Sequence, residues 1–293
     1  MSKSRPTAGM WMRVTASDCS RFRYDLLTVL SGLLTLLTVL TMSSEAVAQP
    51  TGTTSEQGRS PVNVAPEHPL VPAISMARES LSKLQGVRDY DCQFIKREML
   101  GNQLQTHAMY MRCRQEPFSL YLKFGEPHAG REVMYVAGRN NNKLFAHEGS
   151  GVAALVGTMS LALNDPKITA ENRHPLNEAG LHKMLELLIA QWENEAKYGE
   201  IEVQHYPEAR IGKTAVRVIE SMHPQPRRQF PYHITRLYLS VETGLPVRLE
   251  NYAWPQRSGT SPILVEEYTY ARVRPNLGLT EQQFDTRNPE YGF

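Results

Sequence analysis

The sequence predicts an α+β fold in which amphipathic helices cover a curved antiparallel sheet. Short alternating or apolar runs follow one another, separated by the Gly, Pro and Asn clusters that are typical of hairpin turns. Two longer stretches instead carry apolar residues at helical spacing. Because helices do not alternate with the strands, the chain lacks the crossovers that a parallel sheet needs. A long antiparallel sheet curls, and we expect the helices to cover its concave face.

The first 48 residues have the pattern of an export signal. Basic residues precede the apolar run Leu26–Met42, and Ala46-Val47-Ala48 supplies a small-x-small cleavage site. The run is near the lower limit of the roughly 17–25 residues that span a bilayer, so cleavage is favoured over retention as an inner-membrane anchor. Residues 49–71 are rich in Pro, Ser, Thr and Gly and predict a flexible linker. Residues 72–293 then form one domain, exported to the periplasm or cell envelope.

Charge and motifs exclude several function classes. A formal net charge of +2 and the lack of a basic stripe argue against nucleic acid as a partner. No G-x-S-x-G elbow, H-E-x-x-H pair, Walker motif or dinucleotide-binding glycine pattern occurs in the sequence. We therefore predict no cofactor, no catalytic residue and no enzymatic activity.

Helical spacing marks the two main helices of the domain. Ala73–Gln85 is amphipathic and stops at Gly86. Asn177–Lys197 carries a second apolar stripe, with Asn177 as its expected N-cap. The apolar run Ala153–Leu163 predicts a short helix, so a helical insertion divides the strands into two groups.

Turn residues separate the expected strands in both groups. The first group comprises Tyr90–Glu98, Thr106–Arg114, Phe118–Phe124, Glu132–Ala137 and Lys143–His147. The second comprises Glu200–Tyr206, Lys213–Ser221, Tyr232–Val241, Pro246–Ala253 and Ile263–Val273. In the strand Phe118–Phe124, Leu120 and Leu122 alternate with polar residues. This alternation predicts that the two leucines lie on the face that meets the helices. The tail from Asn276 onward is expected to be mostly irregular.

Cys92 and Cys113 form an even pair in a compartment that permits disulfides. If the hairpin turn centres between Asn102 and Gln103, the two cysteines face each other. If it centres on Gly101-Asn102, Cys92 faces Met111 and the cysteines are diagonal neighbours, roughly 7–8 Å apart and too far to bridge. The alternative to a disulfide is a pair of small buried apolar side chains.

Three segments resemble the LolA/LolB superfamily of periplasmic lipoprotein carriers. They are GNQLQTHAMYMRCRQEPFSLYLKFGEPHAGREVMYVAGRNNNKLFAHEG, YHITRLYLSVETGLPVRLENY and EEYTYARVRPNLGLTEQQFD. The phrases PFSLYLKF, GREVMYV, NRHPLNEAGL and the NPEY close resemble an uncharacterised branch, the domain-of-unknown-function 1571 family. The resemblance implies an unclosed barrel with helices as a lid over an apolar cavity. It also implies a lipid, acylated or other amphipathic ligand and transient contact with a membrane.

A cavity for acyl chains needs apolar and adaptable walls, for which Met is well suited. The candidate lining residues are Met109, Met111, Phe118, Leu120, Leu122, Met134, Leu181, Leu185 and Leu188. Ordinary core packing is the alternative role for the same side chains. The resemblance also makes Arg112 and Arg114 candidates for contact with a ligand headgroup or for its retention.

Two other hypotheses come from different function classes. His174, Glu178 and His182 are spaced by four residues, which on a helix would stack them as metal ligands. Pro175 and the expected N-cap place His174 ahead of the helix, so we predict no metal site. The second hypothesis is an envelope scaffold with a filled barrel and a protein partner.

Overall fold

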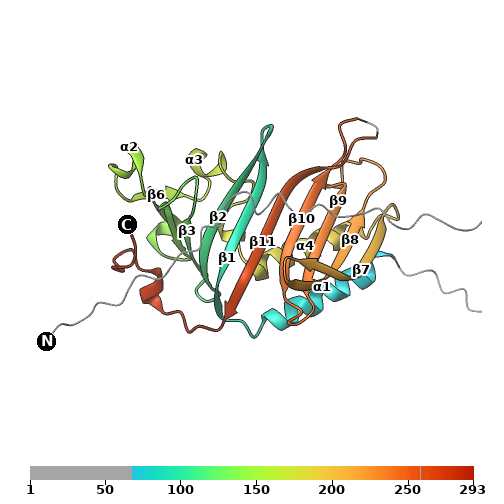
Figure 1. Ribbon diagram of the computed structural model, residues 1–293, viewed down its shortest axis with the longest axis horizontal. Coiled ribbons are helices and arrows are strands. Elements are labelled where there is room, and N and C mark those ends of the chain that lie inside the picture. The colour runs from blue at the N-terminus through green and yellow to red at the C-terminus, as the bar shows by residue number, and fades with distance from the viewer. Residues whose placement is uncertain (1–67, 258) are drawn as a thin grey trace, which may run out of the picture. The chain divides into compact units, whose positions relative to one another are not determined.

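A computed structural model describes residues 68–257 and 259–293 of the chain, and Figure 1 shows a sheet flanked by helices. The predicted signal peptide and nearly all of the predicted linker lie outside these residues. The strands are β1 Asp89–Leu100, β2 Gln103–Arg114, β3 Ser119–Phe124, β4 Glu132–Val136, β5 Lys143–His147, β6 Met159–Ala162, β7 Glu202–Ile211, β8 Thr214–Met222, β9 Ile234–Ser240, β10 Pro246–Ala253 and β11 Ile263–Pro275. Within the described residues, no helix is both long and apolar enough to cross a membrane.

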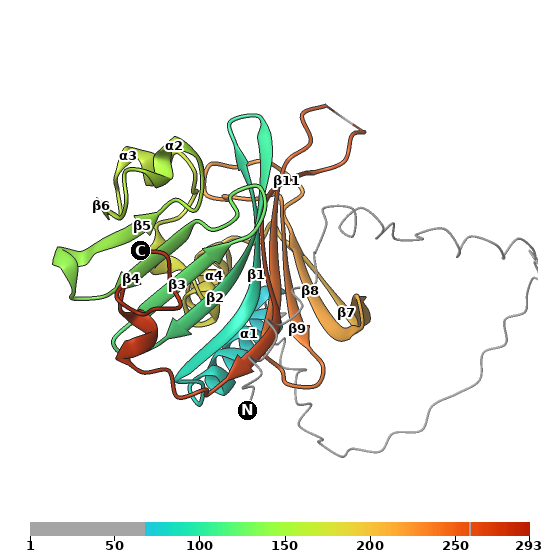
Figure 2. The same ribbon diagram turned by 60° about the vertical axis from the view of Figure 1, so that its left-hand side comes forward.

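The sheet has 11 strands in the order β6-β5-β4-β3-β2-β1-β11-β10-β9-β8-β7. All its pairings are antiparallel, and β6 and β7 remain unpaired with each other at the two edges. The two groups of strands meet at the centre, where β1 pairs with β11 from Tyr90 opposite Pro275 to Glu98 opposite Glu266. The predicted unclosed antiparallel α+β fold is therefore confirmed, and Figure 2 shows the two wings diverging from this central pair.

The predicted helix over Ala153–Leu163 is wrong. A short helix α2 covers Gly151–Ala154, and Gly157 then takes a φ of 75° that ends any helical continuation. The chain continues as β6, where Met159 pairs with Ala146 of β5. Apolar runs of this length do not distinguish a helix from an edge strand.

Helices α1 (Leu70–Leu84) and α4 (Leu181–Glu195) pack against each other and against one face of the sheet. Helix α1 begins three residues before the predicted Ala73, because Leu70 is fully buried in the core. Between β6 and α4 the chain forms α3 (Pro166–Thr169) and the 3-10 turn η3 (Leu176–Glu178).

The expected N-cap at Asn177 is also wrong, because Gly180 interrupts the helix with a φ of 103°. The backbone N–H of Gly180 donates to the Tyr270 hydroxyl at 3.2 Å, and that of Leu181 donates to the Tyr90 hydroxyl at 2.9 Å. Two tyrosines of the sheet thus replace the capping side chain.

The two faces of the sheet carry separate apolar clusters. On β3, Leu120 and Leu122 pack with the helices, whereas Tyr121 belongs to the cluster on the opposite face. The C-terminal segment 276–293 covers that opposite face, with Tyr291 stacked on Tyr121 at 4.2 Å between ring centroids. The turn η4 (Glu281–Phe284) is its only helical element within the described residues.

A Cys92–Cys113 disulfide is absent, and both thiols are free and buried. Leu100 pairs with Gln103, so the turn is Gly101-Asn102. In this register Cys92 pairs with Met111, and the two cysteines are diagonal neighbours on one face. Burial raises the pKa of the Cys113 thiol to about 12, which keeps it protonated.

Candidate ligand-binding cavity

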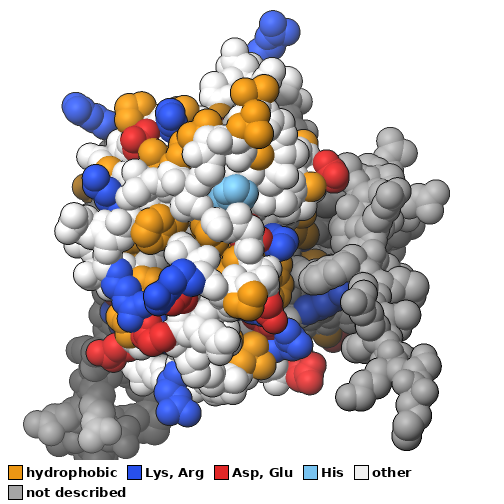
Figure 3. Space-filling view, turned by 90° about the vertical axis from the view of Figure 1, so that its left-hand side faces the viewer, with side chains coloured by type: hydrophobic (Ala, Val, Ile, Leu, Met, Phe, Trp, Pro, Cys, Tyr) orange, Lys and Arg blue, Asp and Glu red, His pale blue; other side chains and the backbone are white. Residues whose placement is uncertain are grey.

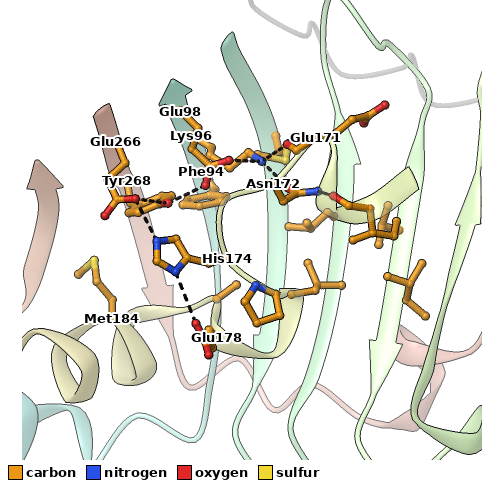
Figure 4. Close-up of a pocket in the computed structure, with 18 of the residues that line it drawn as sticks. Phe94, Lys96, Glu98, Glu171, Asn172, His174, Glu178, Met184, Glu266 and Tyr268 are labelled. Atoms are coloured by element: carbon orange, nitrogen blue, oxygen red, sulfur yellow. Dashed lines mark hydrogen bonds and ion pairs between the residues drawn. The ribbon is translucent and has the colours of Figure 1, made fainter. Parts of the chain in front are cut away.

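The face of the sheet that packs on the helices contains a cavity of about 440 Å³. This volume falls within the roughly 300–1,000 Å³ that is usual for small-molecule sites. Apolar side chains from the sheet, from the insertion between β6 and α4 and from α4 form most of the wall (Figure 4). They include Phe94, Met109, Leu122, Phe124, Val133, Leu144, Ala146, Met159, Leu161, Ile168, Leu176, Met184, Leu187, Leu188 and Leu249.

Three of the predicted lining residues, Met109, Leu122 and Leu188, line this cavity. The other candidates on this face pack in the solid core and do not reach the cavity. They are Met111, Leu120, Leu181 and Leu185, each fully buried, and the partly buried Phe118. These residues lie at positions where the helices fill the face completely.

Met134, predicted to line the cavity, lies instead on the opposite face of the sheet. It is paired with Tyr121 and packs with Val136 and Phe284 in the cluster under the C-terminal segment. All five residues of β4 are buried, because both faces of this strand are covered. Burial therefore gives no indication of which side chains face the cavity.

Arg112 and Arg114 do not line the cavity, and the headgroup role expected of them stays a prediction. Arg112 donates to the Tyr291 hydroxyl at 2.7 Å, and Arg114 forms an ion pair with Glu281 at 2.9 Å. Both partners belong to the C-terminal segment. The two arginines thus fix that segment on the outer face.

One side of the cavity is polar, and its centre is the buried carboxylate of Glu266, which is 2% exposed. One oxygen, Oε1, accepts hydrogen bonds from the Tyr232 hydroxyl at 2.6 Å and the Asn251 amide at 2.7 Å. The other, Oε2, accepts from Arg173 Nε at 3.1 Å and lies 3.0 Å from His174 Nε2. We call Glu266, Glu98 and the donors around them the polar hub.

Glu98, also 2% exposed, is the second carboxylate of the polar hub. It accepts from the Tyr268 hydroxyl at 2.6 Å, from Lys96 Nζ at 3.0 Å and from the Arg173 backbone N–H at 3.1 Å. Lys96 also donates to the Asn172 side chain and to the Glu171 carbonyl (Figure 4). The hub thus joins the two central strands to the insertion.

The residues 164–179, which we call the strap, cross the cavity between β6 and α4 and contribute to its wall. None of them is buried. Polar contacts with Lys96, Glu98 and Glu266 hold the strap, together with an ion pair of 2.7 Å between Arg131 and Glu171. The strap is therefore a thin cover whose position depends on the polar hub.

The hub keeps its central groups in defined protonation states. Burial opposes ionisation of Glu266, but the hydrogen bonds from His174, Tyr232 and Asn251 outweigh it and lower the Glu266 pKa to about 2. The hydrogen bond to Glu266 raises the pKa of His174. Burial and the nearby carboxylates raise the pKa of Tyr268, so its hydroxyl remains a donor. The hub contains an anion at neutral pH that the protein itself neutralises.

The candidate metal ligands do not converge. His174 Nδ1 lies 3.5 Å from a Glu178 carboxylate oxygen, and its other ring nitrogen, Nε2, contacts Glu266. His182 instead has its Nε2 within 2.8 Å of the Leu84 carbonyl oxygen. Across the described part of the chain, no group of three His, Cys, Asp or Glu side chains has a geometry that could hold a metal ion.

Sequence reasoning missed the polar hub, although one signal was available. Lys96 and Glu98 follow Phe94 at intervals of two, so all three share one face of β1. Charged residues on a face that is otherwise apolar indicate a buried polar network more than a solvated strand. Their partners come from the strap and from β11, which no local pattern connects to β1.

Comparison with known proteins gives a family and a set of fold neighbours. Residues 87–293 match the family described as "Protein of unknown function (DUF1571)". No curated protein matches the chain. The predicted resemblance to this family is confirmed.

The solved structures that are similar to the chain include a LolA superfamily protein from Nitrosomonas europaea, with 13% identity, 71% of this chain and 97% of that chain covered, and a TM-score of 0.30. MucB in the MucA/MucB complex of Pseudomonas aeruginosa has 15% identity, 73% and 61% coverage and a TM-score of 0.40. The lipoprotein LppX of Mycobacterium tuberculosis has 12% identity, 71% and 98% coverage and a TM-score of 0.35. At these scores a likeness carries no argument about function, which must come from this chain's own cavity.

Proposed function

The chain belongs to the DUF1571 family of proteins of unknown function, and we propose that it is an exported, non-catalytic binding protein for an amphipathic ligand. The hydrocarbon part of a lipid or acylated molecule occupies the cavity between the sheet, the strap and α4. Export follows from the signal pattern of the first 48 residues.

The observation that carries this proposal is the cavity itself. It is large enough for a ligand, and its walls are mainly apolar. Each CH₂ group that leaves water for such walls contributes roughly 0.8 kcal/mol. Met109, Met159 and Met184 add flexible side chains that adapt to hydrocarbon chains of different shape. An empty volume of this kind also counts against the filled scaffold.

The polar hub supports binding without chemistry. The carboxylates of Glu98 and Glu266 are each engaged by three or more donors of the protein itself. A general base must reach a proton of its substrate, and these oxygens already accept from tyrosine, arginine and lysine. The hub therefore holds the strap in place.

The proposed function is tested by a substitution that fills the cavity with a larger side chain, followed by a measurement of fatty acid binding. Ala146 lines the cavity, so Ala146→Phe places a ring in the empty space without removing any existing side chain. Purified wild-type protein is expected to bind a fluorescent fatty acid, and the variant to bind it at least tenfold more weakly. Native mass spectrometry with lipid extraction would reveal a ligand carried from the cell.

The matched control is Ala215→Phe, which makes the same change at an exposed position on β8. It should bind the fatty acid as the wild type does. Equal binding by Ala146→Phe and wild type in folded proteins would contradict the proposal. So would a wild-type protein that carries no lipid and takes up no fatty acid.

A further inference from the structure

The loop between β5 and β6 presents the most exposed large apolar side chains of the described residues. Val152 is 82% exposed, Leu155 86% and Val156 68%, whereas no other large apolar side chain in residues 68–257 and 259–293 exceeds the 51% of Val241. We call residues 149–158 the apolar tip. Figures 1 and 2 both show α2, which lies in this tip, projecting at the end of the wing formed by β3–β6.

The tip carries no charge. No Asp, Glu, Lys or Arg occurs between Glu148 and Asp165. Of the nearest carboxylates, Glu148 and Glu171 both pair with Arg131, at 2.8 and 2.7 Å, and Asp165 accepts from the backbone N–H of Lys167. A surface of this kind has no charged side chain to desolvate when it leaves water for hydrocarbon.

The base of the tip is held by a close backbone contact, and two glycines bracket its apolar residues. A Cβ atom on Gly149 would lie 2.3 to 2.6 Å from the backbone of Gly130, so the two loops touch here through glycine alone. Gly151 and Gly157 bracket the apolar residues, each with a φ of 75°. Figure 3 views the molecule from this side, where hydrophobic side chains reach the surface in the upper part of the view.

The tip is continuous with the cavity. Glu148 directly precedes it and Met159 directly follows it, and both line the cavity, as does Leu161 further along β6. Apolar surface therefore extends from the exposed tip into the cavity along one short strand.

We propose that the apolar tip inserts into the surface of a lipid bilayer and brings the adjoining cavity to the membrane. A lipid surface fits the tip better than a protein partner does. Protein interfaces are anchored mainly by Trp, Tyr and Arg, which the tip lacks, while Val and Leu are under-represented among such anchors. This inference extends the proposed function, because a binding protein for acyl chains must exchange them with membranes.

The test places a reporter in the tip of the full chain. Leu155→Trp should be quenched by phospholipids brominated in their acyl chains, in vesicles of neutral phosphatidylcholine. The matched control is Val241→Trp, at the next most exposed apolar position and outside the tip, which should not be quenched. The three native tryptophans, including Trp11 of the leader, are the same in both variants, so the difference in quenching between them reports the two introduced positions.

Two further measurements complete the test. Quenching of Leu155→Trp should persist in about 1 M salt, where the Debye length is only ~3 Å, because no ion pair drives the insertion. The double variant Leu155→Asp/Val156→Asp should transfer fatty acid to vesicles at least tenfold more slowly and still bind it in solution. If Leu155→Trp is quenched no more than Val241→Trp, the proposal is wrong, including when the tip binds a protein instead.

The same variants separate this inference from the proposed function. Ala146→Phe should lose fatty acid binding, while its tip, carrying Leu155→Trp, is still quenched by the brominated lipids. Loss of cavity binding with retained insertion, or the reverse, therefore identifies which of the two statements fails.

Discussion

The face of the sheet that carries the helices is covered in two different ways. At one end α1 and α4 lie on the strands, and side chains such as Trp192, Ile219 and Leu237 are completely buried there. At the other end the strap covers the strands together with side chains of α4, and none of the strap's residues is buried. The first end is solid core and the second contains the cavity.

The difference shows how a single sheet supports both stability and a binding site. A helix presents a continuous apolar stripe that fills the face beneath it. The strap instead is held at the polar hub, so its attachment depends on hydrogen bonds and charges. Stability should therefore depend mainly on the helix-covered end, and access to the cavity on the hub.

The largest expected effect is on the helix-covered end. Trp192→Ala removes a fully buried ring and its hydrogen bond of 3.1 Å to the Ser221 hydroxyl. It should lower the free energy of unfolding by about 3–5 kcal/mol, as measured by chemical denaturation. Met109→Ala, in the cavity wall, should cost about 2 kcal/mol, because part of its surface already lacks packing partners. Equal losses would remove the contrast between the two ends.

A smaller effect is expected from the hub. Glu266→Gln keeps an acceptor for Tyr232 and Asn251 but removes the charge that faces Arg173 and His174. We expect a loss of about 2 kcal/mol, since hydrogen bonds to charged groups contribute ~1.5–3 kcal/mol. Hydrogen exchange of the strap should accelerate at the same time.

The matched control for Glu266→Gln is the same change at Glu267, the next residue of β11, whose side chain lies on the opposite face of the sheet. Glu267 is equally buried and pairs with Arg97 at 2.8 Å, but it has no contact with the strap. Glu267→Gln should also destabilise the protein, with strap exchange no faster than in the wild type. Faster exchange in both variants would show that the hub has no special relation to the strap.

The third prediction concerns pH. Glu266 raises the pKa of His174 above its ordinary 6.5, with Glu98 and Glu178 adding to the effect. The stability that protonated His174 contributes is thus complete below about pH 6.5 and is lost as the pH rises through its folded pKa. The difference in unfolding free energy between wild type and His174→Gln should therefore shrink with rising pH.

His182 supplies a control of opposite sign. Burial lowers its pKa, so its contribution is present above about pH 6.5 and is lost as the pH falls below that value. The difference between wild type and His182→Gln should therefore grow with rising pH. Parallel pH profiles for the two variants would contradict the assignment of His174 to the hub.

Local sequence patterns predicted most strands but not which side chains meet in the cavity. Alternation in β3 assigned Leu120 and Leu122 to the correct face, because Ser119, Tyr121 and Lys123 occupy the positions between and beside them. In β4 every residue is apolar or buried, so no alternation indicates which face of the sheet Met134 lies on. The outward direction of Arg112 was available from the sequence, since its neighbour Met111 was a predicted lining residue and successive side chains of a strand point to opposite faces.

The polar hub and the β1–β11 pairing could not be predicted in this way. Glu98 and Glu266 lie opposite each other in that pairing although they are far apart in the chain. The spacing in β1 could point to burial of Glu98, but only the tertiary fold identifies Glu266 as its buried neighbour. The location of the cavity followed from the same long-range pairing.

The smallest expected change in the free energy of unfolding concerns an ion pair on the surface of the helix-covered end. Arg78 of α1 and Glu193 of α4 form an ion pair of 2.7 Å, with side chains 62% and 45% exposed. Exposed pairs of this kind typically contribute ~0–1 kcal/mol, because solvent screens the charges and ordering two long side chains costs entropy. Arg78→Ala should therefore change the free energy of unfolding by less than about 0.5 kcal/mol and leave fatty acid binding unchanged. A loss comparable to that of Trp192→Ala would mean that charge, and not the buried stripe, holds the two helices together.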